Sequence, residues 1–309
     1  MHKPVLVEQA VEMLAVGRGE KFIDGTAGEG GYLKEILKLN EKAKVLGIDL
    51  DQTGLEKLKK DFVQSGLGQR AILVQGNYAH IKKIAIEQGF HEVDGIILDL
   101  GFSSSQLDNP ARGFSFQLDG PLDMRFDQNA ILRADAVLNS YPAEKLVAIF
   151  KEWGEEKFSK RIARRILDLR KTSKIATTGQ LVHLIVDVLP KNLKFRAPDV
   201  ARRIFQALRI EVNQELENLK KGLPQIVDLL KPQGRMVIIS FHSLEDRIVK
   251  EFLRKAAKGC VCPPEFPECV CGKTSKIRIL TKKPVSAGVL EQLENPRSKS
   301  AKMRAAEKI

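Results

Sequence analysis

Short apolar runs alternate with amphipathic helical patterns through the N-terminal third of the chain. The runs end at Asp24, Asp49, Gln75 and Asp99, and the first three are each followed by apolar residues at helical spacing. The fourth run is almost wholly apolar, as expected of a parallel strand covered on both faces. Alternating strands and helices at this spacing predict an α/β fold with a doubly wound parallel sheet.

The strand rhythm stops after about Ser103. Residues 101–125 are rich in Gly, Ser, Asp and Phe and predict a long loop, after which only helical patterns follow as far as Arg209. A strand pattern returns at 234–240 and at 276–281, and residues 301–306 can pair with the latter. We therefore predict a helical domain, residues 108–209, inserted into an α/β domain formed by residues 1–107 and 210–309.

Four glycines lie within residues 25–31, between the first predicted strand and its helix. Such a turn brings backbone N–H groups to a helix N-terminus, where a polar or anionic ligand can approach closely. A dinucleotide fingerprint started from Gly28 and Gly30 requires a third glycine where this chain has Leu33. No Lys-Ser or Lys-Thr pair closes a P-loop either. The turn predicts a nucleoside ligand with a small charged tail.

Two aspartates at strand ends are candidate site residues. An acidic group at Asp49 can accept both hydroxyls of a ribose, as in nicotinamide and S-adenosylmethionine sites. Its alternative role, a helix N-cap, is better filled by Asp51 or Thr53. Asp99 is expected in the same crevice, because ligands of open α/β sheets bind beyond the carboxyl ends of the strands. A carboxylate there is costly to bury without a hydrogen-bonding partner.

The chain has a net charge of +12 and a pI near 9.5, which favours a polyanionic partner such as nucleic acid. Basic residues concentrate in two clusters of the predicted helical domain, each containing one acid. This concentration predicts a surface that follows phosphates rather than an evenly solvated face. The clusters are Lys157, Lys160, Arg161, Arg164, Arg165, Arg170 and Lys171, and Lys191, Lys194, Arg196, Arg202, Arg203 and Arg209.

No membrane association is expected from the sequence. The longest run without a charge, 175–186, has 12 residues, fewer than the roughly 20 that a membrane span needs. Glu8 and Glu12 interrupt the first apolar pattern and argue against a signal peptide. The hydrophobic content of 43% is that of a soluble globular protein, so we expect a cytoplasmic protein.

Seven sequence blocks, taken together and in order, resemble the bacterial RsmH (MraW) family. The resemblance implies a class I (Rossmann-like) methyltransferase domain interrupted by a helical insertion. It also implies S-adenosyl-L-methionine as cofactor and, as substrate, the exocyclic N4 of one cytidine in 16S ribosomal RNA of the small subunit. The blocks are 24–31 (DGTAGEGG), 99–106 (DLGFSSSQ), 112–116 (RGFSF), 119–125 (DGPLDMR), 205–209 (FQALR), 240–247 (SFHSLEDR) and 295–298 (NPRS).

The resemblance also implies which residues contact the cofactor. Tyr32 stands where the family usually has histidine, and Tyr78 where phenylalanine is common. A backbone contact survives the first change, while Tyr78 keeps an aromatic face for the adenine, although a core aromatic would look the same. The implied contacts are Gly30, Gly31, Tyr32, Asp49, Tyr78, Asp99 and Gln106.

Three further features each have two possible roles. Asp99 is the candidate catalytic residue, as an acceptor for the cytosine amino group, or it contacts the cofactor only. His242 contacts RNA or takes up a proton, although a position beside a capping box formed by Ser243 and Asp246 is favoured. The aromatic pair Phe114 and Phe116 stacks on a displaced base or packs as part of a lid against the sheet.

Four cysteines form the pairs Cys260-x-Cys262 and Cys269-x-Cys271. Disulfides are not expected in a cytoplasmic protein, and four thiolates could hold zinc. The pairs have one intervening residue, however, and zinc ligands usually have two to four. No metal ligand is therefore assigned from the sequence.

Other functions remain open at this point. A methyltransferase acting on DNA or another RNA would carry the same site, and a non-catalytic nucleic-acid-binding protein would carry the same charge. The glycine turn with Asp49 and Asp99 intact argues against the second, because a binding module has no reason to keep all three. The sequence decides neither the assembly state of the RNA nor whether the chain forms a homodimer.

Overall fold

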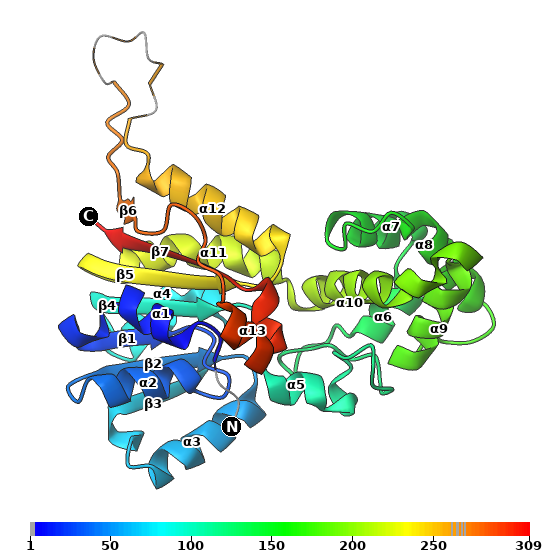
Figure 1. Cartoon of the computed structure of the whole chain (residues 1–309), viewed down its shortest axis with the longest axis horizontal. Helices are drawn as coiled ribbons and strands as arrows, with labels where there is room; N and C mark the ends of the chain where they lie inside the picture. The colour runs from blue at the N-terminus through cyan, green and yellow to red at the C-terminus, as the bar shows by residue number, and fades with distance from the viewer. Residues whose placement is uncertain (1–3, 261, 264–265, 267, 269) are drawn as a thin grey trace. The chain divides into compact units, whose positions relative to one another are not determined.

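The computed structural model describes residues 4–260, 262–263, 266, 268 and 270–309. The chain divides into two compact units, the first formed by Met1–Gly101 with Leu216–Ile309 and the second by Phe102–Glu215. These boundaries lie six residues from the expected ones at 107/108 and 209/210. Each unit is described by itself below (Figure 1).

The first unit is built on a seven-stranded sheet in the order β3-β2-β1-β4-β5-β7-β6. Strands β1 to β5 are parallel, and β7 runs antiparallel to both β5 and β6. The expected pairing of the last two strands is therefore confirmed. The strands are β1 (Lys21–Asp24), β2 (Lys44–Asp49), β3 (Ala71–Gln75), β4 (Val93–Asp99), β5 (Leu230–Ser240), β6 (Ile277–Ile279) and β7 (Lys302–Lys308).

Helices cover both faces of this sheet (Figure 1). The first helix begins at Val7, and residues 1–3 lie outside the described part of the chain. The helices are α1 (Val7–Met13), α2 (Gly31–Leu39), α3 (Gln52–Gln64), α4 (Ile81–Glu87), α11 (Glu215–Leu229), α12 (Ser243–Ala257) and α13 (Val289–Glu294), with short 3₁₀ turns at Val16–Arg18, Gly68–Arg70, Tyr78–His80 and Pro296–Ser300.

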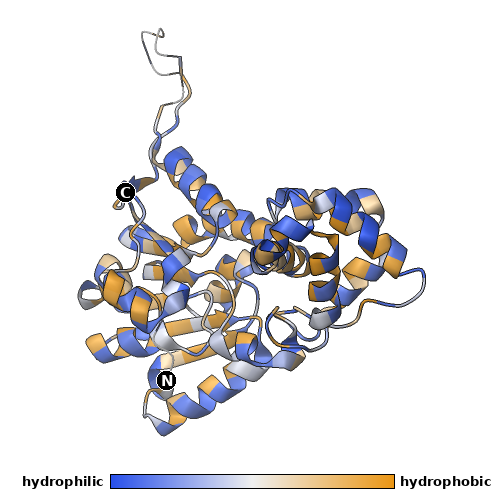
Figure 2. Ribbon diagram, turned by 45° about the vertical axis from the view of Figure 1, so that its right-hand side comes forward, coloured by the Kyte–Doolittle hydropathy of each residue, from blue (hydrophilic) through white to orange (hydrophobic). Residues whose placement is uncertain are grey.

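Alternate residues of each strand supply two separate cores. Phe22 and Ile97 pack with α1, α2 and α3 on one face, while Ile23 and Ile96 pack with α4, α11 and α12 on the other. This follows from the two-residue period of a strand, whose successive side chains point to opposite faces. Figure 2 shows hydrophobic residues along the central strands. A sheet buried on both faces has near-continuous apolar strands, which is why the sequence pattern was so clear.

The second unit is helical around its own apolar core. The segment expected as a long loop, 101–125, contains the short helix α5 and a 3₁₀ turn. The helices are α5 (Ser104–Asp108), α6 (Ala134–Ser140), α7 (Ala143–Glu152), α8 (Ser159–Leu169), α9 (Thr178–Val188) and α10 (Ala197–Asn213), with 3₁₀ turns at Pro110–Arg112 and Lys191–Arg196.

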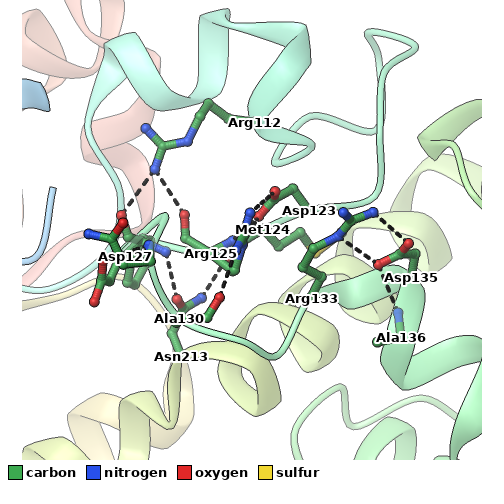
Figure 3. A network of polar contacts seen from close by, with 12 residues as sticks. Arg112, Asp123, Met124, Arg125, Asp127, Ala130, Arg133, Asp135, Ala136 and Asn213 are labelled. Carbon is green, nitrogen blue, oxygen red and sulfur yellow. Dashed lines mark hydrogen bonds and ion pairs between the residues drawn. The ribbon is translucent and has the colours of Figure 1, made fainter.

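A polar network holds the irregular segment between α5 and α6 against α10 (Figure 3). Arg112 donates to the carbonyls of Arg125 and Phe126 at 2.9 and 3.1 Å. Asn213 of α10 accepts from the Phe126 N–H at 2.8 Å and donates to the Met124 carbonyl at 2.7 Å. The blocks 112–116 and 119–125 thus have an architectural role, since these bonds satisfy backbone groups that no helix or sheet satisfies.

The base-stacking interpretation of Phe114 is wrong in this structure. Its ring is 6% exposed and lies between Phe102 and Phe126, with ring centroids 5.6 and 5.5 Å away. Phe116 packs edge-on against Phe205 of α10 at 5.9 Å. Phe114 belongs to the core of the helical unit and Phe116 packs against it, so the packing alternative holds within the helical unit.

Among the described residues, no helix has both the length and the apolar character required to cross a bilayer.

Candidate functional site

Three aspartates end three adjacent strands of the first unit. Asp24, Asp49 and Asp99 are the last residues of β1, β2 and β4, which lie side by side in the order β2-β1-β4. The carboxyl ends of parallel strands meet at one edge, where open α/β sheets bind their ligands. The sequence patterns singled out Asp49 and Asp99 but missed Asp24, which carries the same signal, a carboxylate that ends an apolar strand.

Hydrogen bonds through Thr26 join two of these aspartates. The Asp99 N–H donates to Thr26 Oγ1 at 2.7 Å, and Thr26 donates to Asp24 Oδ1 through both its N–H (3.0 Å) and its hydroxyl (3.2 Å). Within the described part of the chain, Asp24 Oδ2 and Asp99 Oδ1 are buried and have no hydrogen-bond partner. Buried polar atoms are seldom left unpaired, so these two oxygens mark a place for a ligand.

The environment of this pair favours the neutral form of each acid. Burial raises the pKa of Asp24 to about 7, and the negative charge of Asp49 adds to the effect. Burial raises the pKa of Asp99 to about 8, with further contributions from the charges of Asp24 and Glu245. Two acids so close titrate as a pair. Strongly perturbed acids in a crevice are typical of functional sites.

The carboxyl groups at this edge suit a positively charged ligand. Asp24 and Asp99 form no ion pair with any described Lys or Arg, and Asp24 is fully buried. Placing a cation beside them would remove the cost of their ionisation, because an opposite charge nearby favours the charged form of an acid. A nucleoside carrying a sulfonium and an ammonium group meets this requirement, and a pyrophosphate does not.

Asp49 is tied to the glycine turn by its own carboxylate. Oδ2 accepts from the Gly28 N–H at 2.7 Å, and Oδ1 accepts from the Asp51 N–H at 2.9 Å. Each carboxylate oxygen has a second acceptor site, so both can still receive a ribose hydroxyl. The N-cap of α3 is Asp51, as expected, with its side chain accepting from the Gly54 N–H at 3.2 Å.

The glycines of the turn serve packing as well as ligand access. A Cβ at Gly31 would lie 2.1 Å from Pro4 Cγ, and one at Gly30 would lie 2.4 Å from Leu58 Cδ1. Gly30 also has φ +76° as the N-cap of α2. At Gly28, by contrast, an added Cβ would meet only a backbone oxygen at 3.7 Å, so the open side of the turn is at Gly28.

Tyr32 connects the turn to the N-terminal segment and to Asp99. It is 4% exposed, its hydroxyl donates to the Val5 carbonyl at 2.6 Å, and the same oxygen lies 3.3 Å from Asp99 Oδ2. A phenol has one proton to donate, so these two acceptors compete for it. Burial, followed by the charges of Asp99 and Asp24, raises the pKa of Tyr32 well above its usual value, and the side chain acts as a neutral positioning group.

Tyr78 occupies space that two glycines leave free. A Cβ at Gly25 would lie 3.2 Å from Tyr78 Cβ, and one at Gly222 of α11 would lie 3.0 Å from its ring. The 3₁₀ turn that carries Tyr78 starts after Asn77, whose side chain accepts from the Ala79 N–H at 2.8 Å. The ring packs partly into the core beside β4, and its contact with adenine stays a prediction.

Gln106 belongs to the helical unit, whereas the other predicted contacts belong to the first unit. Its Oε1 accepts from the Ser103 N–H at 3.0 Å, and its own N–H donates to Ser103 Oγ at 3.3 Å. These bonds form the capping box of α5. The first unit therefore brings together Gly30, Gly31, Tyr32, Asp49, Tyr78 and Asp99, and Gln106 is not among them.

The capping box at α12 starts one residue earlier than predicted. His242, not Ser243, is the N-cap, with Nδ1 accepting from the Glu245 N–H at 3.5 Å. Glu245 Oε2 in turn accepts from the Phe241 and His242 N–H groups at 2.8 and 3.3 Å. An imidazole nitrogen can take the place of the usual hydroxyl as acceptor, which explains the shift. Asp246 instead pairs with Arg304 at 2.6 Å.

The basic clusters of the helical unit are partly structural. Arg203 pairs with the buried Glu156 at 2.6 Å, and Arg209 pairs with Glu215 at 2.8 Å. Arg170 donates to two backbone carbonyls at the end of α6. These three have structural partners within the helical unit, so the phosphate-following prediction for the clusters depends mainly on their exposed cations. The exposed cations that remain are Lys157, Lys160, Arg161, Arg164, Arg165, Lys171, Lys191, Lys194, Arg196 and Arg202.

A family model described as the MraW methylase family matches residues 1–309. The chain belongs to this family. It is 46% identical over 309 residues to the ribosomal RNA small subunit methyltransferase H of Halothermothrix orenii, covering 100% of this chain and 98% of that protein. It is 45% identical, with the same coverage, to the protein of that name from Carboxydothermus hydrogenoformans.

Among solved structures, an rRNA methylase from Streptococcus thermophilus matches at a TM-score of 0.45 and 9% identity, covering 100% of this chain and 99% of that chain. This likeness is too low to carry an argument. Family membership makes the chain an S-adenosylmethionine-dependent methyltransferase. The predicted α/β class I methyltransferase sheet is confirmed, and the cationic cofactor is the kind of ligand that the unpaired acids of β1 and β4 suit.

Proposed function

We propose that this MraW-family enzyme transfers a methyl group from S-adenosylmethionine to the exocyclic N4 of one cytidine in 16S ribosomal RNA. The observation that carries the proposal is the full-length identity of 46% to a relative named for the RNA of the small ribosomal subunit. The site of the first unit supports it, because its unpaired acids suit a cationic nucleoside.

Each part of the cofactor has a proposed place at the sheet edge. The ribose hydroxyls bind the free acceptor sites of Asp49, whose position is fixed by two backbone N–H groups. The adenine lies against Tyr78, and the methionyl end lies along the turn from Gly28 to Tyr32, within reach of Asp24 and Asp99. Gln106 is the proposed contact from the helical unit, as the family resemblance implies.

The chemistry requires positioning more than a strong base. The bound cofactor supplies a methyl group on a positively charged sulfur. As the new bond to N4 forms and the bond to sulfur breaks, the charge disperses and the nitrogen loses one proton. The cytosine amino lone pair is delocalised into the ring, so acceptors on its N–H groups must hold it in line. Asp99 Oδ1 is a buried acceptor without a partner, and in its ionised form it can also take the proton.

The proposed RNA-binding surface is the exposed cations of the helical unit. Helix α8 buries Ile162 and Ile166 and exposes Arg161, Arg164 and Arg165 on its other side. In the 3₁₀ turn before α10, Phe195 is 78% exposed and stands in sequence between two exposed cations. Base stacking on an aromatic ring beside phosphate-binding cations is a common mode of RNA recognition. Phe195, not Phe114, is then the stacking candidate.

The proposed function is tested by mapping the methylated nucleotide. The full chain is incubated with labelled S-adenosylmethionine and naked 16S RNA, small subunits, whole ribosomes or DNA of the same sequence. One N4-methylcytidine in the small-subunit RNA is the expected product, and it is lost when that cytidine is replaced by uridine. Label in DNA, or at another nucleotide, would support the alternative substrates. No label in any arm would support a non-catalytic binding protein.

Charge removal on α8 is expected to weaken RNA binding in a salt-dependent way. With Arg161, Arg164 and Arg165 changed to glutamine, the slope of log affinity against log salt should fall by about two to three, since each phosphate contact contributes about 0.7 to 0.9. Filter binding or anisotropy at several salt concentrations measures the slope.

Phe195→Ala should lower affinity by about 1–3 kcal/mol and leave the slope unchanged, because stacking releases no counterions.

The matched control lies in the first unit. Lys57, Lys59 and Lys60 are exposed on α3, and changing them to glutamine removes the same net charge. This triple should alter the slope little. Equal losses from both triples would mean that net charge alone binds RNA, and would remove the α8 surface from the proposal.

A further inference from the structure

All four cysteines of the chain lie within residues 260–271, in the segment between α12 and β6. Nothing in the methyl-transfer site uses them. Cys260, Cys262 and Cys271 are described by the structure, and Cys269 lies outside the described residues.

The three described thiols converge on one point. Their Sγ atoms all lie within 4.8 Å of one another, and Sγ of Cys271 is 3.9 Å from Sγ of Cys260. Tetrahedral zinc with Zn–S bonds of about 2.3 Å holds its sulfurs about 3.8 Å apart. A disulfide requires about 2.05 Å. The separation of 3.9 Å fits two ligands on a common tetrahedral metal and is too long for a disulfide.

We propose that this segment binds one Zn²⁺ through the thiolates of Cys260, Cys262 and Cys271. Three thiolates occupy three positions of a tetrahedral zinc ion and leave one position for a further ligand. The Cys-x-Cys spacing argued against a metal, but spacing is only an indirect sign of where the sulfurs lie. The proximity of the three thiols in the structure outweighs it.

The backbone near the thiols supports metal coordination. The Cys262 N–H donates to Cys260 Sγ at 3.4 Å, the kind of outer bond that orients a ligand and stabilises its charge. Gly272 follows Cys271 at φ +60° with open space around it, so the chain can turn there without strain. Lys258 and Lys273 flank the cysteines in sequence, and their charges offset the net negative charge of a zinc ion with three thiolates.

The described side chains of the segment do not supply an apolar core of their own. Its ends are fixed where the Lys276 N–H donates to the Ala256 carbonyl at 3.0 Å and Ser275 Oγ donates to the Ala257 carbonyl at 2.9 Å. Between these ends Phe266 is 50% and Val270 74% exposed, so these side chains form no apolar core. Long segments without secondary structure are uncommon in compact domains, and structural zinc supplies folding free energy where a core is lacking.

The inference is tested on the full chain by counting metal and thiols together. The protein is purified without chelator and analysed by inductively coupled plasma mass spectrometry, with one zinc per chain expected. Because the chain has only four cysteines, a thiol reagent reports on this segment alone. The thiols should react slowly until zinc is removed, and a Co²⁺-substituted sample should show thiolate-to-cobalt charge-transfer absorption.

Two variants and a control complete the test. Cys260→Ser and Cys271→Ser should each lose most of the bound zinc, and Thr274→Ala, an exposed neighbour that offers no thiol, should keep it. If a serine variant does not fold, the zinc content and cobalt spectrum of the unaltered chain still decide. No metal at equilibrium with added zinc, serine variants that retain full zinc, or a Cys260–Cys271 disulfide in the reduced preparation would each overturn the proposal.

Discussion

Replacing Asp99 by asparagine is expected to lower kcat/KM for methyl transfer by about 30- to 4,000-fold. The range corresponds to the roughly 2–5 kcal/mol lost when one partner of a buried charged hydrogen bond is removed. The carboxyl group provides Oδ1, a buried acceptor with no partner in the described chain, and its neighbours are acids rather than bases. Asparagine keeps the shape of the side chain, but it can neither carry the negative charge nor accept a proton at neutral pH.

The same variant separates two roles for Asp99. If it orients the cytosine amino group, kcat falls and the dissociation constant for S-adenosylmethionine, measured by calorimetry, stays nearly unchanged. If it binds only the cofactor, the dissociation constant rises and kcat at saturation recovers. Asp228→Asn is the control, because it makes the same chemical change in an exposed ion pair with Lys82 on the same unit. Normal turnover and normal cofactor affinity in Asp99→Ala would exclude both roles.

Replacing Asp24 by asparagine is expected to stabilise the cofactor-free protein increasingly as pH rises. Burial raises the pKa of Asp24 from 3.8 to about 7, so between these values the folded chain holds a proton that the unfolded chain has lost. Folding stability therefore falls with rising pH across that window. The variant removes this loss. The difference in free energy of unfolding between the variant and the unaltered protein should grow by up to about 4 kcal/mol between pH 4 and pH 7.

Urea unfolding of both proteins at several pH values measures the difference. Asp246→Asn is a contrasting control, because Arg304 holds the pKa of Asp246 below its usual value, although burial opposes this. That variant should be destabilised at neutral pH, and the difference should fade as pH falls below about 4. If the stability difference between Asp24→Asn and the unaltered protein does not change with pH, Asp24 is ionised in the folded protein. Saturating S-adenosylmethionine should reduce the difference, since a bound cation favours the charged acid.

The sheet could be predicted because its strands are buried on both faces and their apolar runs stand out. Asp24 was missed for the opposite reason. Asp24 precedes a glycine-rich turn, and the glycines alone accounted for the sequence pattern there. The role of Asp24 depends on Thr26, which bonds to Asp99, 73 residues further along the chain. The bond between Tyr32 and the Val5 carbonyl is of the same kind. Such contacts arise from tertiary packing, which local spacing does not encode.

Charge counting likewise could not distinguish binding residues from structural ones. Arg202 and Arg203 are adjacent in α10, yet the first remains exposed and the second pairs with Glu156 from the segment before α8. The helical period sends neighbouring residues in different directions, and a partner acid from a distant segment decides the role. The cysteines show the converse, because their spacing argued against a metal and the distances between their thiols argue for one.

The contact between Pro4 and Gly31 matters for how the protein is handled in the laboratory. Because Gly31 has no side chain, Pro4 lies directly against the first turn of α2, and the Leu6 N–H is held by Glu291 of α13 at 2.7 Å. Pro4 therefore lies beside the turn that carries the predicted cofactor contacts Gly30 and Gly31. The C-terminal end of β7 lies at the opposite edge of the sheet, because that strand runs antiparallel to β5. Fusions for binding or kinetic work belong at that end.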